Sequence, residues 1–332
     1  MRELLTALAA ATLAVLVILI GLAVAGHSPG PVLATAWSGV AGSPVRLAIC
    51  LQEATPLLLT GLAAAIAFRA GVLNIGLEGQ YLMGAVAALA VLTSGPLGWP
   101  VLVLAGLAGA LAGALWCAVA VLLERARGVP IVLATILLNV VAAHLVGILV
   151  QGPLHDPGTS APQSALVPEA NRIAALVANT GLHLGAILAV VLALIAWVVQ
   201  RQTPVGFELR VLGLNPVAAE HAGIPAVRRQ GQVALVSGAL AGLAGMLQVA
   251  GVTFFLATDV TSYGYAGIAV ALLGRLHPLG IIPAALFFAG LDVGARQLER
   301  REGIPHDLGD LAKGLTVAAV LVAGALAARR AR

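Results

Sequence analysis

The chain contains a series of nearly uncharged apolar runs, most of them about 20 residues long. A helix of about that length crosses a hydrocarbon core of about 30 Å. Hydrophobic residues make up 60% of the chain and charged residues only 10%, whereas soluble domains are typically about a quarter charged. The mean hydropathy is +1.03. Apolarity is continuous along each run rather than alternating, which argues against a transmembrane β-barrel. We therefore predict an all-α integral membrane protein.

The apolar runs predict where the membrane helices lie. The stretch 264–294 is interrupted by Gly274-Arg275-Leu276-His277-Pro278, and proline disfavours helix before it, so two short helices are expected there. The first run is longer than the apolar core of a signal peptide and is expected to stay attached. The remaining helices are expected near 4–26, 47–68, 71–94, 98–123, 129–151, 183–200, 230–252 and 311–328. The prediction is one polytopic domain over residues 1–332, a bundle of about ten transmembrane or half-spanning helices.

The cationic residues favour a topology with both termini in the cytoplasm, because lysine and arginine collect in cytoplasmic loops. This topology leaves 12 of the 18 cationic residues at inner positions. The outer positions hold Arg46, Arg172, Arg296, Arg300, Arg301 and Lys313. We attribute the net charge of +4 to the cationic residues of the cytoplasmic loops. We therefore expect membrane lipid, and no nucleic acid, among the partners.

Two connecting segments are long. Residues 152–182 are expected outside, and residues 201–229 inside. In the inner segment, Asn215 can cap a helix that begins at Pro216, and Gly223 can end it. The intervening residues include Ala218, Ala219, Glu220 and His221. A short capped helix on the cytoplasmic side is either a docking element or an ordinary connection.

Glycines recur four residues apart in two predicted helices, as Gly109 and Gly113 and as Gly238 and Gly242, with Gly245 nearby. Small residues at this spacing let helix backbones approach closely in a membrane. We predict tight helix packing at these positions.

Polar residues inside the apolar runs are the strongest functional signal. Ionisable groups in a membrane are costly, and they usually face a bundle interior or a cavity. The candidates for a solute pathway are Gln52, Glu53, Asn74, Glu78, Gln80 and Asn139. Asn74 and Glu78 are four residues apart and are expected to share one helical face. The alternative is that these groups form fixed hydrogen bonds between helices, which we favour for Glu78.

No enzyme constellation is convincing. The histidines are scattered without metalloprotease spacing, and the sole lysine, Lys313, stands in LAKG, so the chain has no P-loop. Cys50 and Cys117 show no metal or disulfide spacing and are expected to be small buried residues. The chain is therefore expected to bind no metal or cofactor, and any ATP must be hydrolysed by another polypeptide.

Several segments together resemble permease subunits of bacterial ABC importers in the branched-chain amino acid, ribose and nucleoside group. These segments are FRAGVLNIGLEGQYLMGA at 68–85, PIVLATILLNVVA at 130–142, GFELRVLGLNPVAAEHAGI at 206–224, LVSGALAGLAGMLQV at 235–249 and GYAGIAVALLGRLHPLGII at 264–282. The N-I-G-x-E-G-Q and A-L-L-G-R-x-H-P-L-G patterns look closest to the nucleoside branch. Ribose, galactose and branched-chain amino acids are the alternative substrates.

The resemblance implies a multi-pass protein of the bacterial inner membrane that works with several partners. These are a second permease subunit (a different chain, or else a second copy), cytoplasmic ABC ATPase subunits and an extracytoplasmic substrate-binding lipoprotein. The helix at 216–222 corresponds to the coupling helix that docks on the ATPase. Phe254 or Phe255 is a candidate for stacking on a nucleobase, or else an anchor at the membrane interface. A secondary transporter that uses Glu53 or Glu78 for ion coupling is the alternative from another class, and a membrane enzyme is disfavoured.

Overall fold

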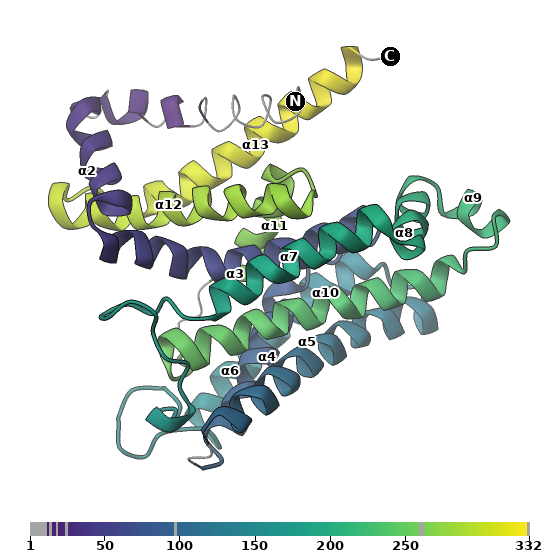
Figure 1. The fold of residues 1–332 in the computed structure, drawn as a ribbon, viewed down its shortest axis with the longest axis horizontal. Helices are drawn as coiled ribbons and strands as arrows, with labels where there is room; N and C mark the ends of the chain where they lie inside the picture. Colours follow the sequence, from purple (N-terminus) through teal and green to yellow (C-terminus); the bar gives the residue numbers. More distant parts are fainter. Residues whose placement is uncertain are drawn as a thin grey trace.

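The computed structural model describes residues 12, 15–17, 19–23, 26–95, 98–258 and 262–330. Most of the first predicted helix, 4–26, lies outside the described residues. The described chain is an elongated bundle of helices, and its long helices run roughly along one common direction (Figure 1). In chain order the helices are α2 (Pro29–Ala41), α3 (Pro44–Arg69), α4 (Leu77–Leu92), α5 (Trp99–Arg127), α6 (Ile131–Gln151), η1 (Glu169–Asn171), α7 (Gly185–Gln202), α8 (Pro204–Leu214), α9 (Pro216–His221), α10 (Ala226–Gln248), η2 (Val249–Thr253), α11 (Tyr263–Leu273), α12 (Pro278–Glu302) and α13 (Asp307–Arg330).

The all-α prediction is confirmed. In the described part of the chain, six helices are long and apolar enough to cross a membrane: α3, α5, α6, α7, α10 with η2, and α12. Two shorter apolar helices, α4 and α11, accompany them. The expected interruption of 264–294 is also present, because α11 ends at Leu273 and α12 begins at Pro278. Two α-helices were not predicted: α2, which begins with Pro29-Gly30-Pro31, and α8, which lies in the inner connecting segment.

The predicted helix 71–94 begins late, so the prediction that Asn74 and Glu78 share one helical face is wrong. Helix α3 ends at Arg69, and the chain then turns through Gly71, which has a φ of +78° that favours glycine. The Asn74 side chain accepts a hydrogen bond from the amide of Gly76 at 3.0 Å, which stabilises a local turn in place of helix. Helix α4 therefore starts only at Leu77.

The centre of the bundle is a close approach of α4, α5 and α10. A Cβ atom added to Gly242 of α10 would collide with the carbonyl oxygen of Gly109 of α5. One added to Gly113 would collide with the carbonyl oxygen of Gly238, and one added to Gly84 of α4 would collide with the backbone of Gly242. The predicted tight packing of these glycines is confirmed, because the three helix backbones are in contact at glycines, which have no side chain.

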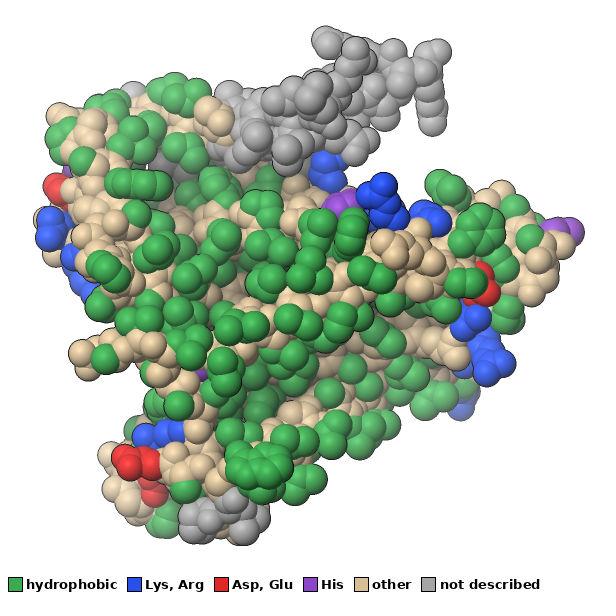
Figure 2. Space-filling model, in the orientation of Figure 1, with side chains coloured by type: hydrophobic (Ala, Val, Ile, Leu, Met, Phe, Trp, Pro, Cys, Tyr) green, Lys and Arg blue, Asp and Glu red, His purple; other side chains and the backbone are tan. Residues whose placement is uncertain are grey.

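The outer surface matches a protein that crosses a membrane. Figure 2 shows hydrophobic side chains across the middle of the face formed by α7, α10 and α5, with charged side chains gathered toward its two ends. Large apolar residues of α5 point outward, among them Leu107, Leu111 and Leu115. Such a surface is stable when lipid covers it.

The two long connecting segments lie at opposite ends of the bundle (Figure 1). Residues 152–182 pack onto the end of α10, where the amide of Val167 donates to the carbonyl of Phe254 at 2.8 Å. The amide of Ser164 donates to the carbonyl of Leu256 at the same distance. Helices α8 and α9 project at the other end. The fold therefore separates a loop-covered end from an end with an exposed short helix.

Candidate functional site

A cavity of about 780 Å³ lies between α3, α11, α12 and α13. Its polar lining comes from all four helices and includes Glu53, Tyr263, Asp292, Arg296 and Lys313. Glu299, His306 and Asp310 line it where α12 ends and α13 begins, at the end of the bundle remote from α9. Only Glu53 of these residues was among the predicted pathway candidates.

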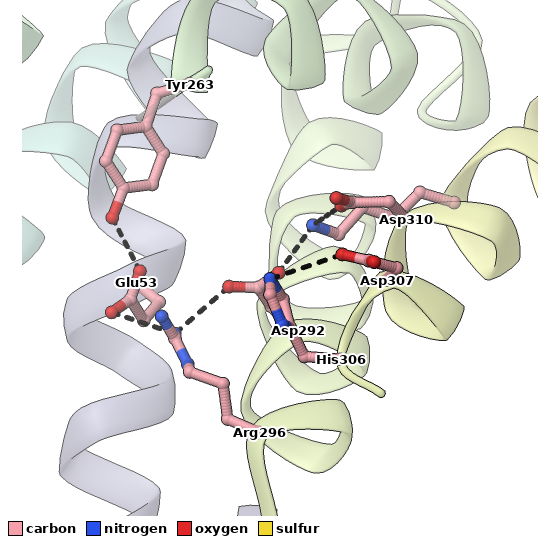
Figure 3. Close-up of polar contacts among 8 residues, drawn as sticks. Glu53, Tyr263, Asp292, Arg296, His306, Asp307 and Asp310 are labelled. Carbon is pink, nitrogen blue, oxygen red and sulfur yellow. Dashed lines mark hydrogen bonds and ion pairs between the residues drawn. The ribbon is translucent and has the colours of Figure 1, made fainter. Parts of the chain in front are cut away.

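Five charged side chains of this cavity and the hydroxyl of Tyr263 form one connected network, which consists of Glu53, Arg296, Asp292, Lys313, Asp310 and Tyr263 (Figure 3). The hydroxyl of Tyr263 donates to Oε2 of Glu53 at 2.6 Å. Nη2 of Arg296 lies 3.0 Å from Oε1 of Glu53 and 3.0 Å from Oδ2 of Asp292. Glu53 is thus bound by a tyrosine of α11 and an arginine of α12, which ties three helices together through a single carboxylate.

Lys313 extends the network to α13. Its Nζ atom donates to Oδ1 of Asp292 at 2.5 Å and to Oδ1 of Asp310 at 2.9 Å. The i,i+4 spacing of Asp292 and Arg296 is visible in the sequence, but the predicted helix ended at residue 294 and placed Arg296 in a loop. Extension of α12 to Glu302 is what brings Arg296 beside Glu53.

Asn74, Gln80 and Asn139 form a separate, fully buried cluster. The Asn74 amide donates to Oε1 of Gln80 at 2.9 Å and to Oγ of Ser237 at 3.0 Å, and Gln80 donates back to Asn74 at 2.9 Å. Asn139 accepts from the amide of Gly79 at 2.8 Å. None of the three lines the cavity. Because their partners are other protein groups, these amides connect α4 to α6 and α10.

Glu78 lies at the junction of α4 and α11 and is buried. Its Oε2 atom accepts a hydrogen bond from the amide of Gly264 at 2.7 Å. Gly264 is in the first turn of α11, where backbone amides lack partners within the helix and where the helix dipole favours a negative charge. Glu78 therefore caps a neighbouring helix, in agreement with the preference for a fixed contact between helices.

We expect Glu78→Ala to lower stability more than solute affinity. Loss of a helix cap costs about 1–2 kcal/mol, and the uncapped Gly264 amide would stay buried. Glu78→Gln is the matched control, since it retains an acceptor oxygen at the same position. Thermal unfolding in detergent and solute binding should be measured on both variants. Normal stability combined with weakened binding in Glu78→Ala would contradict this assignment.

The other candidates lie at the loop-covered end. Oε1 of Gln52 accepts from the amide of Gly181 at 2.7 Å, which holds the long loop against α3. The guanidinium of Arg172 lies 4.5 Å from the ring centre of Phe254, at cation–π distance. Phe255 is half-buried beside it. Neither phenylalanine lines the cavity.

The predicted short helix is present as α9. Asn215 accepts a hydrogen bond from the amide of Ala218 at 3.1 Å, Pro216 is the first residue, and Gly223 follows the end with a φ of +80°. Ala219 is buried against the body of the protein. Glu220 and His221 are exposed, as are Leu214 at 87% and Val217 at 62%. An apolar surface presented on a capped helix beyond the bundle is typical of a contact with another protein.

The geometry is that of a membrane bundle with a polar, partly open cavity and a projecting helix. Among the residues that the structure describes, no group of three His, Cys, Asp or Glu side chains is placed to hold a metal ion. Residues 46–326 match the model of the permease component of branched-chain amino acid transport systems. The chain belongs to this permease family. It is a multi-pass transport subunit of an ABC system and is not itself an enzyme.

Relatives of this permease are named for several kinds of substrate, among them guanosine, glucose and riboflavin. One guanosine ABC transporter permease of Bacillus subtilis is 34% identical over 87% of this chain and 84% of its own length. A second guanosine permease of that organism is 30% identical over 72% of this chain and 77% of its own length. A glucose ABC transporter permease of Haloferax volcanii is 35% identical over 80% of this chain and 73% of its own length. No solved structure matches the permease.

Proposed function

We propose that this permease forms the path by which nucleosides enter the cell in an ATP-driven importer, and that separate ATPase subunits hydrolyse the ATP. The observation that carries the proposal is the capped helix α9, which projects from one end of a bundle whose other end is covered by loops. The nucleoside assignment is supported by the two guanosine permeases of Bacillus subtilis. Uptake of radiolabelled nucleosides by the assembled transporter in proteoliposomes tests it.

The same observations support a binding site for each of two partners. The ATPase docks on α8 and α9, where Leu214 and Val217 supply exposed apolar anchors. This contact requires the α9 end to face the cytoplasm, which is also where the distribution of cationic residues in the sequence predicts both termini. A lipoprotein that binds the substrate docks at the opposite end, over residues 152–182. Co-purification of a tagged permease with the ATPase tests the first contact, and chemical cross-linking at the loop tests the second.

A second permease completes the path. Bacillus subtilis has two permeases named for guanosine, and both are similar to this chain, which supports a pair of different subunits; a pair of identical subunits is the alternative. Native mass spectrometry of the purified assembly distinguishes the two, because a pair of different chains gives two permease masses in equal amounts.

Simple sugars are the second candidate substrate, because the glucose permease of Haloferax volcanii is about as similar to this chain as the guanosine permeases are. Guanosine, glucose and ribose should be compared in one uptake assay. Uptake of a hexose without any nucleoside uptake would replace the nucleoside assignment and leave the importer assignment standing.

A further inference from the structure

We propose that the cavity between α3, α11, α12 and α13 binds the transported solute, and that its charges select uncharged hydroxylated solutes over phosphorylated ones. The inference rests on the proposed function and adds the site and its selectivity. It applies to nucleosides and to simple sugars alike, since both carry hydroxyl groups and no phosphate.

The part of the charged network on α3 and α12 lies deep within membrane-length helices. Glu53 is in the interior of α3, nine residues after Pro44 and therefore roughly 14 Å along a helix that rises 1.5 Å per residue. Asp292 is ten residues from the end of α12, at a similar depth from the same end of the bundle. Charges at such depth are costly, and in membrane proteins they mark solute and ion pathways.

The charged side chains of the network form ion pairs, but two of them remain partly exposed. The side chains of Asp292 and Arg296 keep 31% and 37% of their surface exposed, although both take part in ion pairs. Both residues line the partly open cavity, so this exposed surface is accessible to water or to a solute. Carboxylate oxygens accept hydrogen bonds from hydroxyl groups, and a guanidinium carries five N–H donors. The cavity walls can therefore bind a sugar hydroxyl both as a donor and as an acceptor.

Helix α11 brings aromatic residues to the same cavity. It has only 11 residues and cannot cross a membrane, and its first turn lies inside the bundle, where Gly264 contacts the buried Glu78. Tyr263 and Tyr265 belong to that turn and line the cavity, and Tyr265 is exposed. A broken helix that starts beside a solute site is a recurrent feature of transporters. An exposed tyrosine ring gives a nucleobase or a sugar face a surface on which to pack.

The size and lining single out this cavity in the described part of the chain. Binding sites for small molecules usually have volumes of about 300–1,000 Å³, and this cavity has about 780 Å³. Two others, of about 350 and 370 Å³, have walls that are almost entirely apolar. A fourth, of about 280 Å³, is polar but lies near the α9 end, beside Gly71 and Arg125.

The balance of charge predicts the selectivity. Four carboxylates line the cavity, from Glu53, Asp292, Glu299 and Asp310, against two cations, Arg296 and Lys313. Each of these cations already contacts two carboxylates. A phosphate would therefore meet a net negative surface with no cation free of a carboxylate partner. An uncharged solute pays no such electrostatic penalty.

Cysteine labelling tests whether a solute occupies the cavity. Ser262→Cys places a thiol on the cavity wall with little change in shape, and Ser160→Cys places one on the exposed loop outside it. The native Cys50 and Cys117 are buried and can be replaced by alanine. The assembled transporter in proteoliposomes, without the binding protein, should be labelled with a membrane-impermeant maleimide. We expect guanosine to slow labelling of Ser262→Cys severalfold, guanosine 5′-monophosphate to leave it unchanged, and neither to affect Ser160→Cys.

Charge variants at the rim test the selectivity. Asp310→Asn removes one cavity charge, and Asp307→Asn makes the same change three residues away on α13, outside the lining. We expect Asp310→Asn to let guanosine 5′-monophosphate slow labelling of Ser262→Cys at a concentration roughly tenfold lower. This factor follows for a phosphate of about −1.5 to −2 charges that lies about 10 Å from the carboxylate at an effective dielectric constant of about 40. The Asp307 side chain is 83% exposed, so solvent screens its charge, and Asp307→Asn should shift that concentration much less.

The outcomes separate this inference from the proposed function. If the wild-type transporter takes up guanosine with ATP but guanosine does not slow labelling of Ser262→Cys, the cavity is not the solute site. If the nucleotide slows labelling as well as the nucleoside does, or if Asp307→Asn acts like Asp310→Asn, the charge selectivity is wrong. Absence of ATP-driven uptake of guanosine and of sugars by the wild type contradicts the proposed function instead.

Discussion

Ala219→Pro in α9 should nearly abolish the ATP hydrolysis that solute stimulates in the assembled transporter, while the membrane bundle stays folded. The amide of Ala219 donates to the carbonyl of Asn215 at 3.0 Å, and proline removes that donor. Proline inside a helix costs about 3 kcal/mol, which corresponds to roughly a hundredfold loss of the docking-competent helix. A helix of six residues has no further turns to absorb the change.

The control for this prediction is Glu220→Ala, one residue along the same helix. Glu220 is exposed and alanine is a good helix former, so α9 should persist. ATP hydrolysis, recovery of the ATPase on a tagged permease and thermal unfolding should be measured on both variants. Solute-stimulated hydrolysis at the wild-type rate in Ala219→Pro would show that α9 does not couple the two subunits. A large fall in the unfolding temperature of Ala219→Pro would instead attribute the loss of ATP hydrolysis to unfolding of the bundle.

Gly242→Ala should destroy most of the folded permease, although it adds only one methyl group. The new Cβ would collide with the carbonyl oxygen of Gly109, which belongs to the backbone of α5 and cannot rotate away. Separation of α10 from α5 would also open its contact with Gly84 of α4. Overpacking of a core usually costs about 1–3 kcal/mol, and a clash of backbone with Cβ lies at or beyond the top of that range.

Gly106→Ala is the matched control on α5. Its added Cβ would meet only the end of Leu243, at 3.9 Å, and alanine is favoured over glycine within a helix by about 1 kcal/mol. The yield of monodisperse protein in detergent and its unfolding temperature should be unchanged or raised in Gly106→Ala and strongly lowered in Gly242→Ala. Equal stability of the two variants would contradict the close approach of α4, α5 and α10.

The sequence predicted those features that local pattern determines. Long apolar runs located the membrane helices, the spacing of Gly109, Gly113, Gly238 and Gly242 predicted their close approach, and the Asn215-Pro216 cap predicted α9. The start of α4 was missed because the positive φ of Gly71 and the turn at Asn74 ended the helical pattern that apolarity alone suggested.

The charged cavity could not be predicted in the same way. Its pairs join residues far apart in the chain, Glu53 with Arg296 and Tyr263 with Glu53, and only the packing of α3, α11 and α12 brings them together. The sequence did contain two local signals, the i,i+4 pair of Asp292 and Arg296 and the i,i+3 pair of Asp310 and Lys313. Arg296, however, lies beyond residue 294, where the predicted helix ended. Polar residues that were visible, such as Asn74 and Asn139, instead form hydrogen bonds within the core.

The structure also bears on ion coupling as the alternative mechanism. Glu53 is held by Arg296 and Tyr263, and Glu78 caps α11, so both carboxylates have fixed protein partners. A carboxylate that binds and releases a proton or a cation in each cycle would have to break these contacts. This geometry favours a static role for both residues and agrees with a transport cycle driven from the ATPase.

The central claim is that this permease moves nucleosides only when a separate ATPase drives it. The most direct measurement is uptake of radiolabelled guanosine into proteoliposomes that contain the permease pair and the binding protein, with and without the ATPase and ATP. Proton and sodium gradients should be imposed in parallel. We predict guanosine uptake that requires both the ATPase and ATP and that neither gradient replaces. Gradient-driven uptake without the ATPase would contradict the account.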